Sequence, residues 1–200
     1  MFSSVIISGA LAQDHEFIYP YYRLLEANSK LDVCIIGGGV VGLAIARACA
    51  INGQSTLLLE RENSLVSGAS SGNSGIGCTG YDAPVGSLER QLLRRSIQLH
   101  PEIYRSLGLS YDHVRKCGSL VIAWSPCDLQ ALHEVLQDNI DAGDQEARFV
   151  SQAELRIMEP SLSSEALGAV YLPRETVVEP WLVARGYAES ALLHGATIRL

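Results

Sequence analysis

Basic residues are scarce in this chain. Among its 200 residues, 15 lysines and arginines stand against 22 aspartates and glutamates, which gives a formal net charge of −7 at pH 7. Nucleic-acid recognition requires a basic face that neutralises phosphates, so this balance argues against a nucleic-acid partner. Long apolar runs are also absent, because no stretch approaches the roughly 18 residues that a membrane-spanning helix needs. We therefore expect neither a nucleic-acid-binding protein nor a membrane span.

The chain has five cysteines, which are widely spaced, and no two of them form a C-x-x-C pair. An odd, scattered set predicts neither a disulfide framework nor a zinc site, and we expect no metal. Cys34 and Cys49 fall in a predicted buried strand and a predicted helix, where a thiol behaves as a small hydrophobe. Hydrophobic residues make up 48% of the chain, which is enough to bury a core and indicates a soluble globular protein.

The most informative stretch runs from residue 32 to residue 60. A short apolar run over 33–36, bounded by glycine, is typical of a strand that is buried on both faces. A glycine turn and a helix rich in small residues follow, and Asn52 and Gly53 predict the end of that helix. The run over 56–59 predicts a second apolar strand, so the stretch has the order strand, glycine turn, helix, strand.

The three glycines of the turn have distinct physical roles. Gly37 permits a tight turn, Gly39 removes the Cβ that would block a pyrophosphate, and Gly42 lets the helix pack closely on the strand. The N–H groups of Val40, Val41 and Gly42 then lie at a helix N-terminus, where the helix dipole favours a phosphate. The pattern predicts a dinucleotide site, and an ordinary strand–helix–strand unit without a ligand is the alternative.

A carboxylate ends the second strand. Glu60 lies at about the 20-residue spacing from the glycines at which an acidic side chain accepts hydrogen bonds from ribose hydroxyls. Arg61 follows it, and this side chain either stacks beside an adenine or is a solvated surface arginine. Together with the glycine turn, Glu60 indicates a site for the ADP part of a dinucleotide.

The loop that follows Glu60 bears on which dinucleotide is bound. Residues 67–81 are a run of hydroxyls, amides and glycines, placed where a nicotinamide-binding domain normally continues into another helix and strand. Such a run can wrap backbone N–H groups and Ser or Asn side chains around a second phosphate and the edge of a flavin. A flexible linker is the alternative, because Gly and Ser alone are typical of linkers.

With these motifs in place, the sequence resembles the FAD-dependent oxidoreductase superfamily that includes D-amino-acid oxidase and sarcosine oxidase. Glycerol-3-phosphate dehydrogenase and L-2-hydroxyglutarate dehydrogenase form the branch that looks nearest. The resemblance runs from about residue 31 to the end of the chain. It is carried by residues 37–60, 68–75, 117–123, 159–160 and 178–180.

The resemblance implies an α/β fold: a Rossmann-like FAD-binding domain with the start of an inserted α+β substrate domain, truncated at its C-terminus. On that comparison the chain is roughly the first half of a flavoenzyme. The implied organisation is an unassigned leader over 1–30, an FAD-binding part over 31–85, helices and strands leading into the substrate domain over 86–195, and the start of a further FAD-sheet strand over 196–200.

The resemblance also implies FAD as the cofactor and oxidation of a small hydroxy acid or amino acid by hydride transfer to the flavin. The cofactor-binding residues that it implies are Gly37, Gly39, Val40, Val41, Gly42, Glu60 and Arg61 for ADP, then Ser70, Ser71, Asn73 and Ser74 for the pyrophosphate–flavin side. No catalytic residue is assigned. Relatives tend to present a histidine after the Asn-Ser-Gly segment, whereas this chain has Cys78, which either approaches the flavin or fills space.

Two other functions remain open. The first is a nicotinamide-dependent dehydrogenase, against which the serine-rich loop argues. The second is a truncated flavoprotein without activity that acts as a binding module. The substrate, the electron acceptor and the oligomeric state are not predicted.

The N-terminus gives no clear targeting signal. The sequence Ala-Leu-Ala at 10–12 resembles a cleavage box, but no positive charge precedes it and the apolar stretch is short. Asp14 and Glu16 argue against a transit peptide, and an extra helix over 19–27 is the alternative. We leave the localisation unassigned and favour the cytoplasm or a mitochondrion over secretion.

Periodicity and capping residues predict the remaining elements. Ser87 caps a helix with an apolar face formed by Leu88, Leu92, Leu99 and Ile103, which Pro101 kinks or restarts and Gly108 ends. We further expect strands over 119–124, 149–150 and 196–200, a strand or hairpin over 167–178, and helices over 126–142, 152–158 and from Pro180 to about Gly195.

Overall fold

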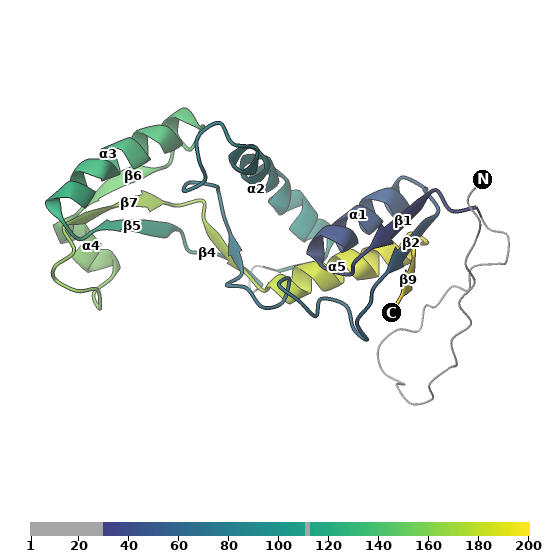
Figure 1. Ribbon diagram of the computed structural model, residues 1–200. Helices are drawn as coiled ribbons and strands as arrows, with labels where there is room; N and C mark the ends of the chain where they lie inside the picture. The colour runs from purple at the N-terminus through teal and green to yellow at the C-terminus, as the bar shows by residue number, and fades with distance from the viewer. Residues whose placement is uncertain (1–29, 111–112) are drawn as a thin grey trace.

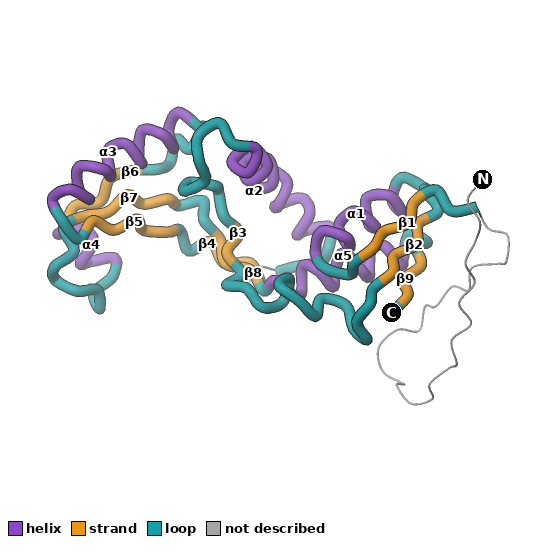
Figure 2. The backbone as a smooth tube through the Cα atoms, in the orientation of Figure 1, coloured by secondary structure: helices purple, strands orange, loops and turns teal. Residues whose placement is uncertain are grey.

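The computed structural model describes residues 30–110 and 113–200. All but one residue of the predicted leader over 1–30 therefore lies outside the described residues. Within them, strands form three sheets of three strands each. Figures 1 and 2 show the parallel sheet at one end of an elongated arrangement, the sheet of β5, β6 and β7 at the other, and the sheet of β3, β4 and β8 between them.

The parallel sheet has the order β1-β2-β9 and carries two helices on one face. Its strands are β1 (Val33–Ile36), β2 (Thr56–Leu59) and β9 (Thr197–Arg199), and its helices are α1 (Val40–Ile51) and α5 (Pro180–Leu193). Alanines let the two helices approach closely, with Ala46 and Ala50 of α1 packed in one core with Ala184, Ala188 and Ala191 of α5. Leu58 of the central strand lies fully buried beneath them.

The opposite face of this sheet has no helix within the described residues. The expectation that the strand over 33–36 is buried on both faces is therefore wrong. Val33 and Ile35 point to the helices, whereas Cys34 is exposed and Ile36 is 88% exposed. Cys34 is consequently not the buried small hydrophobe that its apolar neighbours suggested.

The antiparallel sheet at the far end has the order β5-β7-β6. Its strands are β5 (Ser119–Ala123), β7 (Gly168–Leu172) and β6 (Arg148–Ser151), and it packs against α3 (Pro126–Asp141) and α4 (Gln152–Met158). Leu132 of α3 and Leu155 of α4 lie in separate buried clusters, so both faces of this sheet are covered. The helices and strands expected over 119–158 are confirmed, each to within a few residues.

A small antiparallel sheet of order β3-β8-β4 joins the two ends. Its strands are β3 (Ile76–Gly77), β8 (Thr176–Val178) and β4 (Val114–Lys116). The hairpin considered over 167–178 is not formed, because β7 and β8 lie in different sheets and do not pair with each other. The chain passes directly from one sheet to the next through the turn at 173–175.

Helix α2 (Leu88–Ser106) begins where predicted, with the Ser87 side chain accepting from the Arg90 N–H. Of the two outcomes expected at Pro101, a restart does not occur, because the helix continues through this residue. The expectation that Leu88 and Leu92 pack inward is wrong, because both are exposed. Arg90 and Ile97 are the buried residues of this helix, so its inward face begins with a cation and not with leucine.

No helix among the described residues is both long and apolar enough to cross a membrane.

Candidate cofactor site

The glycine turn joins β1 to α1 with very little space for side chains. Gly37 has a φ of 110°, a conformation that L side chains rarely adopt. A Cβ at Gly42 would collide with the Gly37 carbonyl oxygen, whereas a Cβ at Gly39 would lie 3.1 Å from Ser70 Oγ. Gly42 is therefore required by the turn itself, and Gly39 keeps open the space in front of the helix.

Ser70 reaches back from the serine-rich loop to this helix N-terminus. Its Oγ accepts a hydrogen bond of 2.9 Å from the Val40 N–H. Among the described residues, the N–H groups of Val41 and Gly42 have no partner. Free N–H groups at the start of a helix attract an anion, because the hydrogen-bond donors and the helix dipole act in the same direction.

Glu60 is held against the same turn by two backbone N–H groups. Its Oε2 accepts from the Gly38 N–H at 2.5 Å, and its Oε1 accepts from the Glu62 N–H at 2.9 Å. These two hydrogen bonds lower the pKa of Glu60 below its ordinary value of 4.5, so the side chain is an anion at neutral pH. Each oxygen keeps acceptor capacity for a further donor such as a ribose hydroxyl.

Gly38 is a position in the candidate site that the sequence analysis missed. A Cβ there would lie 3.0 Å from Glu60 Oε2 and against the Leu65 side chain, so a larger residue would push the carboxylate out of place. The glycine-rich pattern assigns roles only to the first, third and sixth positions. The contact of the second glycine with Glu60 depends on how the second strand lies beside the turn.

The remaining side chains that were predicted to bind the cofactor do not all face the glycine turn. Ser71 and Asn73 bond to carbonyl groups of residues 68–70, and Asn73 Oδ1 accepts from the Gly75 N–H at 2.8 Å. These bonds fold the loop upon itself, which argues against a flexible linker. Ser74 is exposed, and the Arg61 side chain is 91% exposed and pairs with Glu62 instead of facing the turn.

Cys78 follows the loop and is half-buried. Its Sγ accepts from the Gly80 N–H at 3.2 Å and lies 3.8 Å from Asp82 Oδ1. Burial raises the pKa of this thiol above its ordinary value of 9.0, with smaller contributions from Glu175 and Asp82 in the same direction. The thiol is therefore protonated at neutral pH and unsuited to act as a general base.

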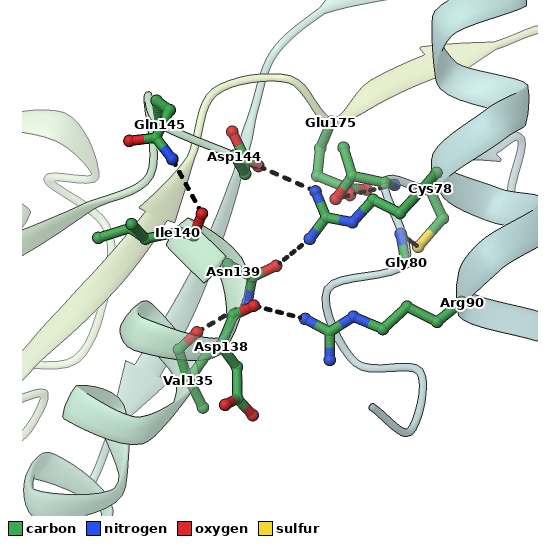
Figure 3. A network of polar contacts seen from close by, with 12 residues as sticks. Cys78, Gly80, Arg90, Val135, Asp138, Asn139, Ile140, Asp144, Gln145 and Glu175 are labelled. Atoms are coloured by element: carbon green, nitrogen blue, oxygen red, sulfur yellow. Dashed lines mark hydrogen bonds and ion pairs between the residues drawn. The ribbon is translucent and has the colours of Figure 1, made fainter. Parts of the chain in front are cut away.

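The next residue makes a contact that the sequence analysis did not anticipate. Thr79 is fully buried, and both its N–H and its Oγ1 donate to Glu175 Oε1, at 2.6 and 2.5 Å. Glu175 lies next to the Cys78–Gly80 segment in Figure 3, although it is distant in sequence. This carboxylate ties the end of the serine-rich segment to the turn before β8.

This arrangement fits an ADP-containing cofactor. The glycine turn leaves free N–H groups and open space for a pyrophosphate, and the oriented Glu60 carboxylate suits a ribose. The residues that could hold such a cofactor are Gly37, Gly39, Val40, Val41, Gly42, Glu60 and Ser70.

Comparison with known proteins agrees with this geometry. Residues 32–200 match the family described as FAD dependent oxidoreductase. The chain belongs to that family, and FAD is the family's cofactor.

Two curated relatives are similar in sequence. Glycerol 3-phosphate dehydrogenase from Caloramator mitchellensis is 31% identical over 169 residues, which are 84% of this chain and 35% of the relative. Mitochondrial L-2-hydroxyglutarate dehydrogenase from Homo sapiens is 28% identical over 174 residues, which are 86% of this chain and 36% of the relative. The chain thus spans little more than a third of the length of these relatives.

Solved structures share the fold. Glycine oxidase from Bacillus cereus superposes with a TM-score of 0.74 at 26% identity, over 85% of this chain and 46% of that protein. The FAD-bound L-α-glycerophosphate oxidase from Mycoplasma pneumoniae gives a TM-score of 0.76 at 23% identity, over 84% of this chain and 44% of that protein. The expected Rossmann-like α/β fold is confirmed.

Proposed function

We propose that this protein holds FAD at the glycine turn and takes part in the oxidation of a small hydroxy acid or amino acid. The observation that carries the proposal is the convergence of three elements: the free N–H groups at the start of α1, the Ser70 hydroxyl and the oriented Glu60 carboxylate. Family membership supplies the identity of the cofactor.

Each group in the site has a separate role in the proposal. The N–H groups of Val41 and Gly42 stabilise the pyrophosphate charge, and Ser70 adds or exchanges a hydrogen bond at the same place. Glu60 accepts from the ribose hydroxyls and fixes the adenosine end. FAD, when bound, supplies the redox chemistry by accepting a hydride equivalent from the substrate. The residues named here bind and orient the cofactor, and none of them acts as an acid or base.

The substrate class rests on the relatives. The similar proteins include a glycerol 3-phosphate dehydrogenase, an L-2-hydroxyglutarate dehydrogenase and a glycine oxidase. Each of these substrates carries a hydroxyl or an amine on a carbon that also bears hydrogen. A CH–OH or CH–NH donor is therefore the proposed substrate of the whole protein to which these residues belong.

FAD titration of the purified chain tests the cofactor site. We expect the visible absorption bands of oxidised flavin to co-elute with the protein, and Gly39→Val to abolish binding because its side chain occupies the pyrophosphate position. Glu60→Ala should weaken binding by about 1–3 kcal/mol through the lost hydrogen bonds. Glu62→Ala is the matched control, because that carboxylate pairs with the exposed Arg61. Unchanged FAD affinity in both site variants would refute the assignment.

Limited proteolysis tests the serine-rich loop. If Ser70 faces the cofactor, the segment 67–75 should be cleaved more slowly when FAD is present. Equal cleavage with and without FAD would separate this loop from the site. The Glu60 result would be unaffected, so the two assignments fail independently.

Activity assays separate the remaining functions. Dye reduction with L-2-hydroxyglutarate, glycerol 3-phosphate, sarcosine and D-amino acids tests turnover. FAD binding without turnover of any of them is expected of a non-catalytic binding module. Tight NAD binding without flavin would favour a nicotinamide-dependent dehydrogenase, against which the loop that directly follows Glu60 argues.

A further inference from the structure

A cavity of about 480 Å³ lies away from the glycine turn and shares no residue with it. It is formed by the C-terminal half of α2, by β4 and by the turn that leads into β8. In Figure 2, α2 lies above this small sheet and to one side of it. The volume is within the range of about 300–1,000 Å³ that small-molecule sites occupy.

Three cations from three different elements line this cavity. They are Arg105 near the end of α2, Lys116 on β4 and Arg174 in the turn before β8. Within the described residues none of them forms an ion pair, and no side-chain hydrogen bond satisfies them. Among the described residues of the lining, Glu146 is the one carboxylate, and it forms no ion pair with any of the three cations.

These three cations line one cavity in a chain whose net charge is −7. Unpaired like charges that converge on a concave surface repel each other, and an anion in the cavity relieves that repulsion. Arg174 is half-buried, so part of its hydration is already lost, whereas Arg105 and Lys116 are exposed. The local charge therefore favours an anionic ligand over a neutral or cationic one.

The rest of the lining is apolar or neutral. Ile97, Pro101 and Leu109 supply aliphatic surface, and the His100 ring stacks on Tyr104 with centroids 5.0 Å apart. Burial lowers the pKa of His100 below its ordinary value of 6.5, so the ring is neutral at pH 7. No group in the described part of the chain forms a hydrogen bond with its buried Nδ1. The cavity thus combines a cationic rim with an apolar interior and one unsatisfied polar atom.

We propose that this cavity binds a small organic dianion with an apolar part, of the phosphate-monoester or dicarboxylate class. Arg174 and Lys116 bind the anionic group, and the surface around Ile97 and Tyr104 receives the apolar part. An inorganic ion alone would leave most of the cavity unfilled. The site is separate from the proposed cofactor site and does not depend on it.

Binding of phenyl phosphate and of phthalate, measured by calorimetry and by protein NMR, tests the proposal. Phenol serves as the uncharged control ligand. We expect both dianions to bind and phenol to bind far more weakly. Arg174→Gln and Lys116→Gln should each raise the dissociation constant about tenfold, as expected when one charge-assisted contact is lost.

A neighbouring arginine provides a matched control. Arg115 precedes Lys116 on β4, does not line the cavity and points to the other face of the strand. Arg115→Gln removes the same charge, so it should leave the affinity within about twofold if the contact is local. The relative affinity of the two ligands then distinguishes a phosphate site from a dicarboxylate site.

Three results would overturn the proposal. They are the absence of binding by both dianions, equal losses in the Arg115 and Arg174 variants, and displacement of phenyl phosphate by FAD. Circular dichroism of each variant establishes that it is folded. FAD affinity, measured in parallel, should be unchanged by Arg174→Gln. A failure of the cavity proposal therefore does not count against the proposed cofactor site.

Discussion

The glycine turn and the junction between α2 and α3 both contain hydrogen-bonding groups. They differ in whether those groups are open to a ligand or are buried against other parts of the protein. At the turn, the N–H groups of Val41 and Gly42 have no partner within the described residues, and Glu60 keeps acceptor capacity. At the junction, Arg90, Asn139 and Asp144 are buried and held by contacts within the protein, although Arg90 Nε and both Asp144 oxygens have no hydrogen-bond partner among the described residues. The candidate site is therefore marked by free N–H groups at a helix N-terminus beside an oriented carboxylate, and not by buried or unsatisfied polar atoms alone.

The junction is built around two arginines of α2 (Figure 3). Arg90 donates to the Asp138 carbonyl oxygen at 3.0 Å, and Arg94 donates to Asn139 Oδ1 at 2.6 Å. Both reach the C-terminal end of α3, where exposed carbonyl groups and the helix dipole favour cations. Asp144 is completely buried, and among the described residues its two oxygens have an ion pair with Arg94 at 3.9 Å but no hydrogen bond.

Removing Arg94 should have the largest effect on stability. Arg94→Ala leaves the buried Asp144 without a counter-charge, which should lower the free energy of unfolding by about 3 kcal/mol. Urea denaturation measures this, and Arg95→Ala is the control because Arg95 is exposed. The double variant Arg94→Leu, Asp144→Leu should recover much of the loss. No recovery in the double variant would show that the charge pair is not the cause.

Removing the contact between Thr79 and Glu175 should have the second-largest effect on stability. Glu175→Ala leaves two buried donors of Thr79 without an acceptor, and we expect a loss of about 2 kcal/mol in the free energy of unfolding. Glu175→Gln keeps an acceptor oxygen and should lose less. A loss from Glu175→Gln as large as that from Glu175→Ala would show that charge, not hydrogen bonding, holds the segment.

Two alanine substitutions in the glycine turn should separate folding from binding. Gly42→Ala forces a Cβ against the Gly37 carbonyl oxygen and should lower the stability of the free protein by about 1–3 kcal/mol. Gly39→Ala meets only the Ser70 hydroxyl, so it should leave the thermal midpoint nearly unchanged and weaken FAD binding. Equal thermal losses in both variants would contradict the separate roles of the two glycines.

The smallest expected effect is the pH dependence that Glu60 contributes. Hydrogen bonds from Glu62 and Gly38 lower its pKa in the folded state, so its contribution to stability is present above the ordinary value of 4.5. That contribution is lost as the pH falls through the lowered pKa. Glu60→Gln should therefore show a shallower decline in thermal midpoint below about pH 4.5 than the unmodified protein. Identical slopes would mean that the two hydrogen bonds do not favour the ionised form.

The local elements followed from the sequence because their signals are local. Ser87 caps α2 by accepting from the Arg90 N–H, as predicted, and Pro180 begins α5. The glycine turn was also predictable, since its spacing reflects backbone sterics within one strand–turn–helix unit. These features depend on residues a few positions apart, and they were confirmed.

Positions that depend on distant neighbours were not predictable in this way. Leu88 and Leu92 have helical spacing, yet the arginines on the other side of α2 find partners at the end of α3 and turn these leucines outward. Ile36 is apolar, yet the described helices cover only the other face of its sheet. Periodicity identifies an apolar face but does not say what packs against it.

The sequence by itself determined the strand–turn–helix unit, the caps and the resemblance to an FAD-dependent family, because each rests on residue types at short, fixed spacings. Only the tertiary structure decided that Gly38 contacts Glu60, that Ser70 reaches the start of α1 and that Glu175 binds Thr79. These contacts join residues 22, 30 and 96 positions apart. Residues so far apart in the sequence are brought together by sheet pairing and helix packing, and no local pattern in the chain encodes these.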